Sequence, residues 1–181
     1  MTKTNVTRRE DGFTLLELLL VIGVAALLLI GGIATYRLVS DGNKATEATR
    51  LLLTLRQEAQ VMAQQQGGNY EGISFDSTTD SASSPLVVSG IVRNNQRNPF
   101  NGAIFVDPEG TGNVNLRVEF ENITQAACVR LVQAVNNPND VRSVAVNGSE
   151  IASAATDFPI NAADAATACA NTASSVTWIF P

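Results

Sequence analysis

A long apolar run lies near the start of the chain. Residues 13–36 contain 24 positions, and Glu17 is the single charged side chain among them. At about 1.5 Å of rise per residue, such a helix would be roughly 36 Å long, which is enough to cross a hydrocarbon core of about 30 Å. The pattern therefore predicts a membrane-spanning helix at 13–36.

The apolar pattern then changes from continuous to periodic. Small and aliphatic residues recur at spacings of three and four, which places them along one face of a helix. These residues are Ala45, Ala48, Leu52, Leu55, Ala59 and Met62. No proline precedes Pro85, and the first strong helix breaker is the glycine pair at 67–68. We therefore expect one helix over 13–66 whose second half, 37–66, is amphipathic.

Four glycines, Gly23, Gly31, Gly32 and Gly42, interrupt this helical pattern. Small residues permit close helix packing in membranes, and glycine also weakens a helix locally. The sequence leaves both interpretations open.

The remainder, 67–181, has the patterns of an α+β head. Alternation over 114–120 predicts a half-buried strand, and residues 86–92, 141–146 and 176–180 are further strand candidates. Residues 124–135 have the apolar spacing of a helix with Thr124 at its N-cap. The Asn147-Gly148 pair predicts a tight turn between strands. We expect an antiparallel sheet packed on the amphipathic half of the helix, giving a ladle-shaped subunit.

Composition excludes several functions. The net charge of −5 over 181 residues argues against nucleic acid as a partner, because phosphate binding requires cationic surface. The sequence contains no histidine, which removes the commonest general base and metal ligand. We therefore expect no enzyme, no cofactor and no metal site.

The first twelve residues carry Lys3, Arg8 and Arg9 ahead of the apolar run. This basic segment orients the N-terminus towards the cytoplasm. An uncleaved signal anchor and an ordinary cleaved signal peptide would both have such a segment. Neither requires Glu17, and an acid at mid-bilayer depth costs about 2.5–3.5 kcal/mol. The position of Glu17 argues against both.

Gly-Phe-Thr-Leu-Leu-Glu at 12–17, followed by the apolar helix, resembles the class III signal of type IV pilins and pseudopilins. The resemblance implies that residues 1–12 form a leader, that a membrane peptidase cuts between Gly12 and Phe13, and that Phe13 is then N-methylated. It also implies that Glu17 pairs with the new amine of a neighbouring subunit. Such a pair neutralises two charges in an apolar filament core and fixes the register between subunits.

Cys128 and Cys169 are the two cysteines of the chain. Two cysteines cannot form a tetrahedral metal site, and one disulfide in an oxidising compartment is their simplest use; two buried free thiols are the alternative. In pilins, such a pair bounds the variable C-terminal region, here 128–169. An Asn-Pro-Phe turn at 98–100 and a Thr-Gln-Ala-Ala-Cys helix start at 124–128 resemble the type IVb branch, including conjugative thin-pilus and toxin-coregulated-type major pilins.

Three other features have ordinary structural interpretations. Oxygen-bearing side chains at 107–113 faintly resemble a calcium loop, but a simple turn is favoured. The sequons at Asn122 and Asn147 are interpreted as chance matches. Trp178 is expected to be a packing residue.

These observations predict a structural subunit that forms a helical homopolymer. Its expected partners are a prepilin peptidase, an assembly ATPase and a platform membrane protein. The expected location is the bacterial inner membrane, followed by the pilus on the cell surface. A minor pilin or secretion pseudopilin, and a bitopic membrane protein that never polymerises, are the alternatives.

Overall fold

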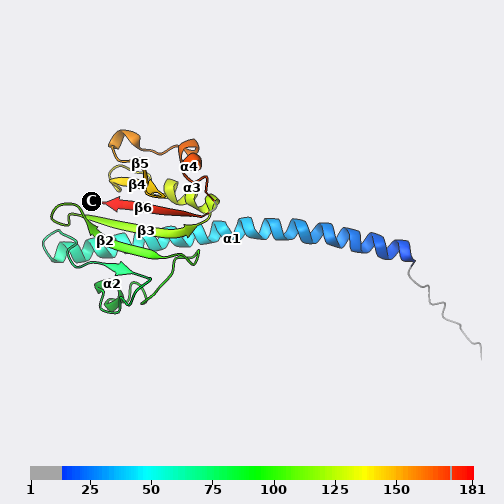
Figure 1. Cartoon of the computed structure of the whole chain (residues 1–181), viewed down its shortest axis with the longest axis horizontal. Coiled ribbons are helices and arrows are strands. Elements are labelled where there is room, and N and C mark those ends of the chain that lie inside the picture. Colours follow the sequence, from blue (N-terminus) through cyan, green and yellow to red (C-terminus); the bar gives the residue numbers. More distant parts are fainter. Residues whose placement is uncertain (1–13, 172) are drawn as a thin grey trace, which may run out of the picture. The chain divides into compact units, whose positions relative to one another are not determined.

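The computed structural model describes the backbone of residues 14–171 and 173–181 (Figure 1). The chain forms two compact units, Met1–Val39 and Ser40–Pro181, which are described separately. The first helix, α1, spans Leu15–Gln65 and contributes to both units. The proposed leader and Phe13 lie outside the described residues.

The described part of the first unit is the apolar portion of α1. The stretch Leu15–Gly32 is long and apolar enough to cross a membrane, and none of its residues is buried. The helix runs without a break through Gly23, Gly31 and Gly32. The predicted helix at the apolar run is confirmed.

The second unit contains an antiparallel sheet. Six strands form this sheet among the described residues, in the order β1-β2-β3-β6-β4-β5. They are β1 (Phe75–Asp76), β2 (Ile104–Glu109), β3 (Asn115–Ile123), β4 (Ser143–Val146), β5 (Ser149–Ala152) and β6 (Ser174–Phe180). The helical elements are α2 (Pro85–Val88), α3 (Gln125–Ala134), the 3₁₀ turn η1 (Ala155–Asp157) and α4 (Ala162–Ala168).

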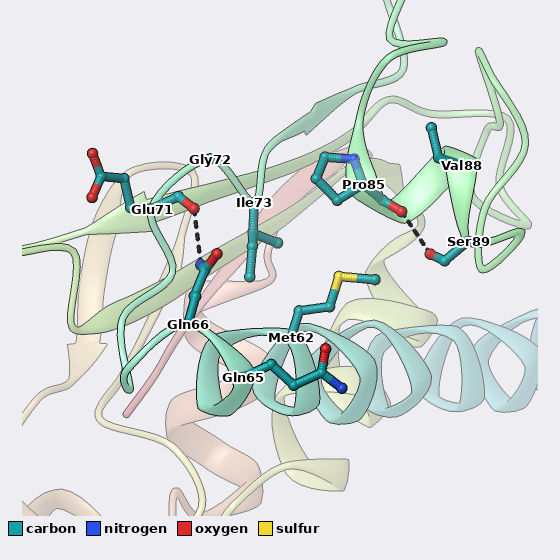
Figure 2. Close-up of a pocket in the computed structure, with 9 residues that line it drawn as sticks. All are labelled: Met62, Gln65, Gln66, Glu71, Gly72, Ile73, Pro85, Val88 and Ser89. Atoms are coloured by element: carbon teal, nitrogen blue, oxygen red, sulfur yellow. Dashed lines mark hydrogen bonds between the residues drawn. The ribbon is translucent and has the colours of Figure 1, made fainter.

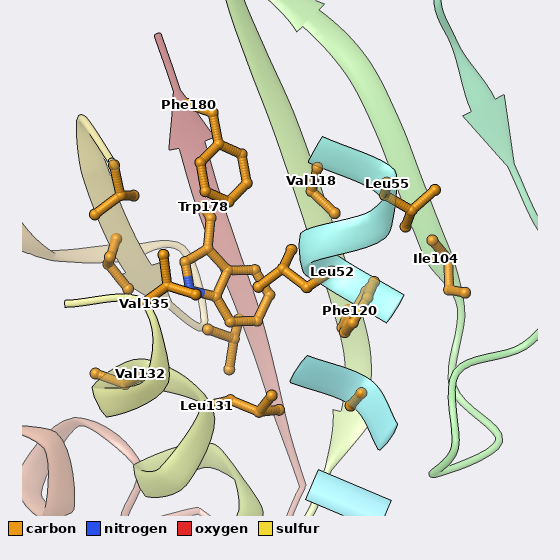
Figure 3. Packing of buried hydrophobic residues seen from close by; sticks show 14 of the residues in the cluster. Leu52, Leu55, Ile104, Val118, Phe120, Leu131, Val132, Val135, Trp178 and Phe180 are labelled. Carbon is orange, nitrogen blue, oxygen red and sulfur yellow. The ribbon is translucent and has the colours of Figure 1, made fainter. Parts of the chain in front are cut away.

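The core lies between this sheet and the second half of α1 (Figure 3). Leu52 and Leu55 are fully buried against strand residues whose side chains alternate inward. Phe120 of β3 and Trp178 of β6 meet edge to face, with ring centroids 5.6 Å apart. The α+β class and the packing role of Trp178 are confirmed.

The amphipathic stripe and α3 follow the sequence pattern closely. All predicted stripe positions are buried except Met62, which is half-buried, while Ala63 is buried next to it. The apolar face expected for the helix at 124–135 is buried as well: Ala127, Cys128, Leu131, Val132 and Val135. Thr124 is the N-cap of α3, but its side chain makes no capping hydrogen bond. Its hydroxyl instead donates to Asp41 of α1 over 3.4 Å.

The strand predicted at 86–92 is wrong. Pro85 begins the short helix α2 there, and Gly90 follows it with a φ of 76°. Proline has its φ fixed near the helical value and lacks an N–H, so it suits the first turn of a helix. Leu86 and Val92 are buried in the core, whereas Val88 is 75% exposed, so this segment covers the core as a turn of helix and needs no partner strand.

The turn at Asn147-Gly148 is confirmed, but it joins β4 to β5, a strand that the sequence pattern did not predict. β4 also pairs with β6, which lies on the other side of β4 from β5. β5 is polar and lies at the sheet edge, so it lacks the apolar alternation that identifies a strand.

Asn98 organises the turn at 98–103. Its side-chain oxygen accepts from the backbone N–H groups of Phe100 and Gly102, at 2.9 and 3.0 Å. Its amide donates to the carbonyls of Ala103 and Glu121, at 3.3 and 2.7 Å. A Cβ at Gly102 would lie 1.8 Å from the Glu121 carbonyl oxygen, so only glycine fits there. This close approach joins the turn to β3.

Asn98→Ala should lower the free energy of unfolding by about 2–4 kcal/mol, because it leaves several buried backbone groups unpaired. Chemical denaturation of the full chain in detergent measures this change. Arg97→Ala, at an exposed position just before this turn, is the control. Equal stability of the Asn98 variant and the unaltered chain would contradict the role of Asn98.

Candidate functional site

Glu17 lies in the first turn of α1 and is exposed. Its backbone N–H donates to the Thr14 hydroxyl over 3.3 Å, so Thr14 satisfies one free donor of the helix start. No cation lies within ion-pair distance of its carboxylate in the part of the chain that the structure describes. The carboxylate is therefore available to a group from outside this helix. Gly12 and Phe13, the predicted processing residues, fall outside the described residues.

Cys128 and Cys169 form a disulfide, and their Cα atoms are 5.8 Å apart. Cys128 lies on the inward face of α3, and Cys169 is the C-cap of α4. Both are fully buried. The expected disulfide is therefore confirmed and the alternative of free thiols is excluded; the bond joins α3 to the end of α4, a helix that the sequence pattern did not predict. Asn161 caps α4 by accepting from the N–H groups of Ala163 and Asp164.

Arg56 connects α1 to two other parts of the head, and the sequence did not reveal it. Its guanidinium donates to Asp140 over 3.1 Å and lies 5.1 Å from the centroid of the Phe180 ring. Nearby, the Tyr70 hydroxyl donates to the Pro181 carbonyl over 2.9 Å. Burial raises the pKa of Tyr70, and the Arg56 charge partly opposes that shift. These contacts hold the 137–141 loop and β6 against the helix.

A groove of about 600 Å³ lies beside the C-terminal end of α1 (Figure 2). We call it the distal groove. Met62, Ile73 and Pro85 form an apolar floor, and Gln65 and Glu71 stand at its rim. Gln66 holds the rim in place by donating to the carbonyls of Asn69 and Glu71, each at 2.9 Å.

The calcium-like segment 107–113 divides between two elements. Residues 107–109 belong to β2, and a turn with positive φ at Gly110, Gly112 and Asn113 follows. No group of three or more acidic, histidine or cysteine side chains that could hold a metal ion is present in the described portion. The simple-turn interpretation agrees with this geometry.

The two sequon asparagines have structural contacts. Asn122 and Asn147 both have positive φ, at 58° and 52°. The Asn122 amide donates to the Phe100 carbonyl, and the Asn147 side-chain oxygen accepts from the Ser175 N–H, each over 2.9 Å. Asparagine adopts this backbone region more readily than most residues. Both side chains thus hold turns together. These structural roles account for asparagine at the two positions.

Three observations on related proteins identify the family. The prokaryotic N-terminal methylation motif matches residues 7–33, and the family described as PilS N terminal matches residues 42–180. The toxin coregulated pilin of Vibrio cholerae is 26% identical over 163 residues, covering 87% of this chain and 72% of the relative. The chain belongs to this PilS family of type IV pilins.

Solved structures agree on the fold of this pilin. TcpA, a type IV pilin from Vibrio cholerae El Tor biotype, aligns with a TM-score of 0.53 at 20% identity. It covers 76% of this chain and 98% of its own. A type IVb pilin from Salmonella typhi aligns with a TM-score of 0.50 at 16% identity, covering 76% and 97%. As a type IV pilin, the chain is a structural subunit of a pilus, and its relatives are structural proteins and not enzymes.

Removing the disulfide should lower the free energy of unfolding of this pilin by about 4 kcal/mol, because the bond closes a loop of 41 residues. The double variant Cys128→Ala/Cys169→Ala, unfolded in denaturant, measures the change, with the reduced unaltered chain as a comparison. A double variant as stable as the oxidised chain would contradict a stabilising role.

Asp107→Asn should stabilise the head at neutral pH. Burial raises the pKa of Asp107 above its ordinary value of 3.8, Arg117 opposes the rise, and Asp76, Glu109 and Glu119 add to it. Because the folded state holds this proton more tightly than the unfolded state does, ionisation of Asp107 lowers the free energy of unfolding as the pH rises above the ordinary pKa of 3.8. The gain in the variant should therefore disappear below about pH 3.

Asp76→Asn is the matched control with the opposite sign. Hydrogen bonds from Thr78 lower the pKa of Asp76, so its carboxylate stabilises the fold at neutral pH and loses that effect in acid. Unfolding titrations of both variants from pH 2 to 8 would check the pair. Equal pH profiles for the two variants would contradict these assignments.

Proposed function

We propose that this pilin is the major subunit of a type IV pilus, cut after Gly12, N-methylated on Phe13 and polymerised through α1. The observation that carries the proposal is the position of Glu17, an exposed acid in the first turn of an unburied apolar helix. The match of the N-terminal methylation motif to residues 7–33 supports cutting at this place. Type IV pilins assemble into filaments, and the motif implies a prepilin peptidase.

Four segments then have separate tasks. Residues 1–12 are the leader, 13–36 cross the membrane and later line the filament core, 37–66 join the core helix to the head, and 67–181 form the head. An acid in the core costs free energy unless a cation pairs with it. Cutting after Gly12 creates a cationic amine on Phe13 four residues before Glu17. We infer that Glu17 pairs with this amine of a neighbouring subunit.

The subunit resides in the bacterial inner membrane before assembly and at the cell surface afterwards. The basic leader supports an N-terminus in the cytoplasm, where a peptidase, an assembly ATPase and a platform protein would act. The buried disulfide supports a head outside the cytoplasm, because disulfides persist in oxidising compartments. The acidic head does not favour nucleic acid as a partner.

Glu17→Ala should reduce surface filaments by at least about a hundredfold, because it leaves an unpaired amine in the apolar core at a cost of about 3–5 kcal/mol. Filament yield in sheared fractions measures the effect, while the amount of cut protein in the membrane should stay constant. Glu47→Ala, which removes an exposed acid farther along α1, is the control and should polymerise normally.

Normal filament levels with Glu17→Ala would contradict the pairing role. Absence of filaments from the unaltered chain would favour a bitopic protein that does not polymerise. Scarcity of the chain in filaments built mainly from another subunit would favour a minor pilin or pseudopilin.

A further inference from the structure

The head carries unpaired charges of opposite sign at two places along α1. Arg50 of α1 and Arg130 of α3 line a second groove, of about 300 Å³, whose floor is Ala45 and Ala134. We call it the proximal groove. Neither arginine makes an ion pair or a hydrogen bond with any described residue, although each guanidinium has five N–H donors.

Gly42 accounts for the position of Arg130. A Cβ at residue 42 would lie 2.6 Å from Nη1 of Arg130, so the missing side chain lets the guanidinium approach α1 closely. The arginine is thereby presented beside α1 at the end where this helix enters the head. The Arg130 side chain is exposed there.

The distal groove has the complementary chemistry. Its apolar lining includes half-buried Met62 and exposed Pro85 and Val88, which suit the aliphatic part of an arginine side chain (Figure 2). The Glu71 carboxylate and the Gln65 side-chain carbonyl lie on opposite sides of this groove, and each can accept from a guanidinium (Figure 2). Neither side-chain group has a hydrogen-bond partner within the described residues.

The two grooves cannot meet within one head. Arg50 and Gln65 are separated by 15 residues of α1, which is about 23 Å along the helix. Contact between the grooves therefore requires two copies of the chain. Such a contact joins different surfaces of the two copies, and repetition of a contact of this kind generates an open helical array.

We propose that the proximal groove of one head docks on the distal groove of another, with Arg130 and Arg50 of one copy facing Glu71 and Gln65 of the next. The inference rests on the proposed function, since it names the contact by which heads stack along the filament. The partner is a second copy of this chain. The proximal groove carries positive charge and the distal groove carries negative charge. Contacts between two proximal grooves or two distal grooves are therefore disfavoured, and the contact between unlike grooves is favoured.

Charge reversal tests the contact in the full-length chain. Arg130→Glu and Glu71→Arg should each reduce sheared filaments about tenfold or more, because each places like charges together. The double variant Arg130→Glu/Glu71→Arg should recover most of the loss. Arg142→Glu and Glu150→Arg reverse exposed charges that line neither groove, and both should assemble normally.

Cross-linking gives a readout that a folding defect would not produce. In Arg130→Cys/Glu71→Cys filaments, oxidation should link subunits into a ladder on non-reducing gels. The native cysteines already form a disulfide within the head and do not contribute. Arg142→Cys/Glu71→Cys should give no ladder.

The outcomes separate this contact from the proposed function. Normal assembly of both single reversals would overturn the contact while leaving the chain a filament subunit. Failure of the double variant to recover, with no ladder, would assign Arg130 to another anion, such as a lipid phosphate, and would also overturn it. An unaltered chain that forms no filaments would overturn the proposed function and the contact together.

Discussion

Burial of one face of α1 is the constraint on which the head depends. Leu52 and Leu55 are fully buried, and burying each such side chain contributes about 1.5–3 kcal/mol. The sheet supplies the opposing surface through the inward side chains of β3 and β6 (Figure 3). Since the same helix continues into the apolar run, one element carries both the fold of the head and the segment that we assign to the filament core.

Elements with strong periodicity could be predicted from the sequence. The stripe of α1 and the alternation of β3 both place apolar side chains on one face, and the structure buries those faces except at half-buried Met62 and at Val114, which precedes β3 and is 49% exposed. The turn at Asn147-Gly148 was predictable because that pair favours positive φ at both positions. The segment at 86–92 was mistaken for a strand because short apolar runs do not distinguish strand from helix. Weakly apolar elements such as β5 and α4 gave no periodic signal.

The side-chain interactions of the head were harder to predict from the sequence than its fold. Glu17 and the cysteine pair stand out because their residue types are unusual in their surroundings. The Arg56–Asp140 pair joins residues 84 positions apart, and no local pattern marks either one. Asn98 and Gly102 act through backbone groups of β3, and Arg130 reaches over Gly42 from another helix. Such contacts depend on the register of the sheet and on how helices pack, which a single sequence does not specify.

We propose that this pilin enters the filament after its leader is removed and with its Cys128–Cys169 disulfide formed. Intact mass and N-terminal sequence of purified filament material test it most directly. The account predicts a chain that begins at N-methylated Phe13 and lacks the two thiol hydrogens of Cys128 and Cys169. Filaments whose subunits begin at Met1, or whose cysteines remain reduced, would contradict it.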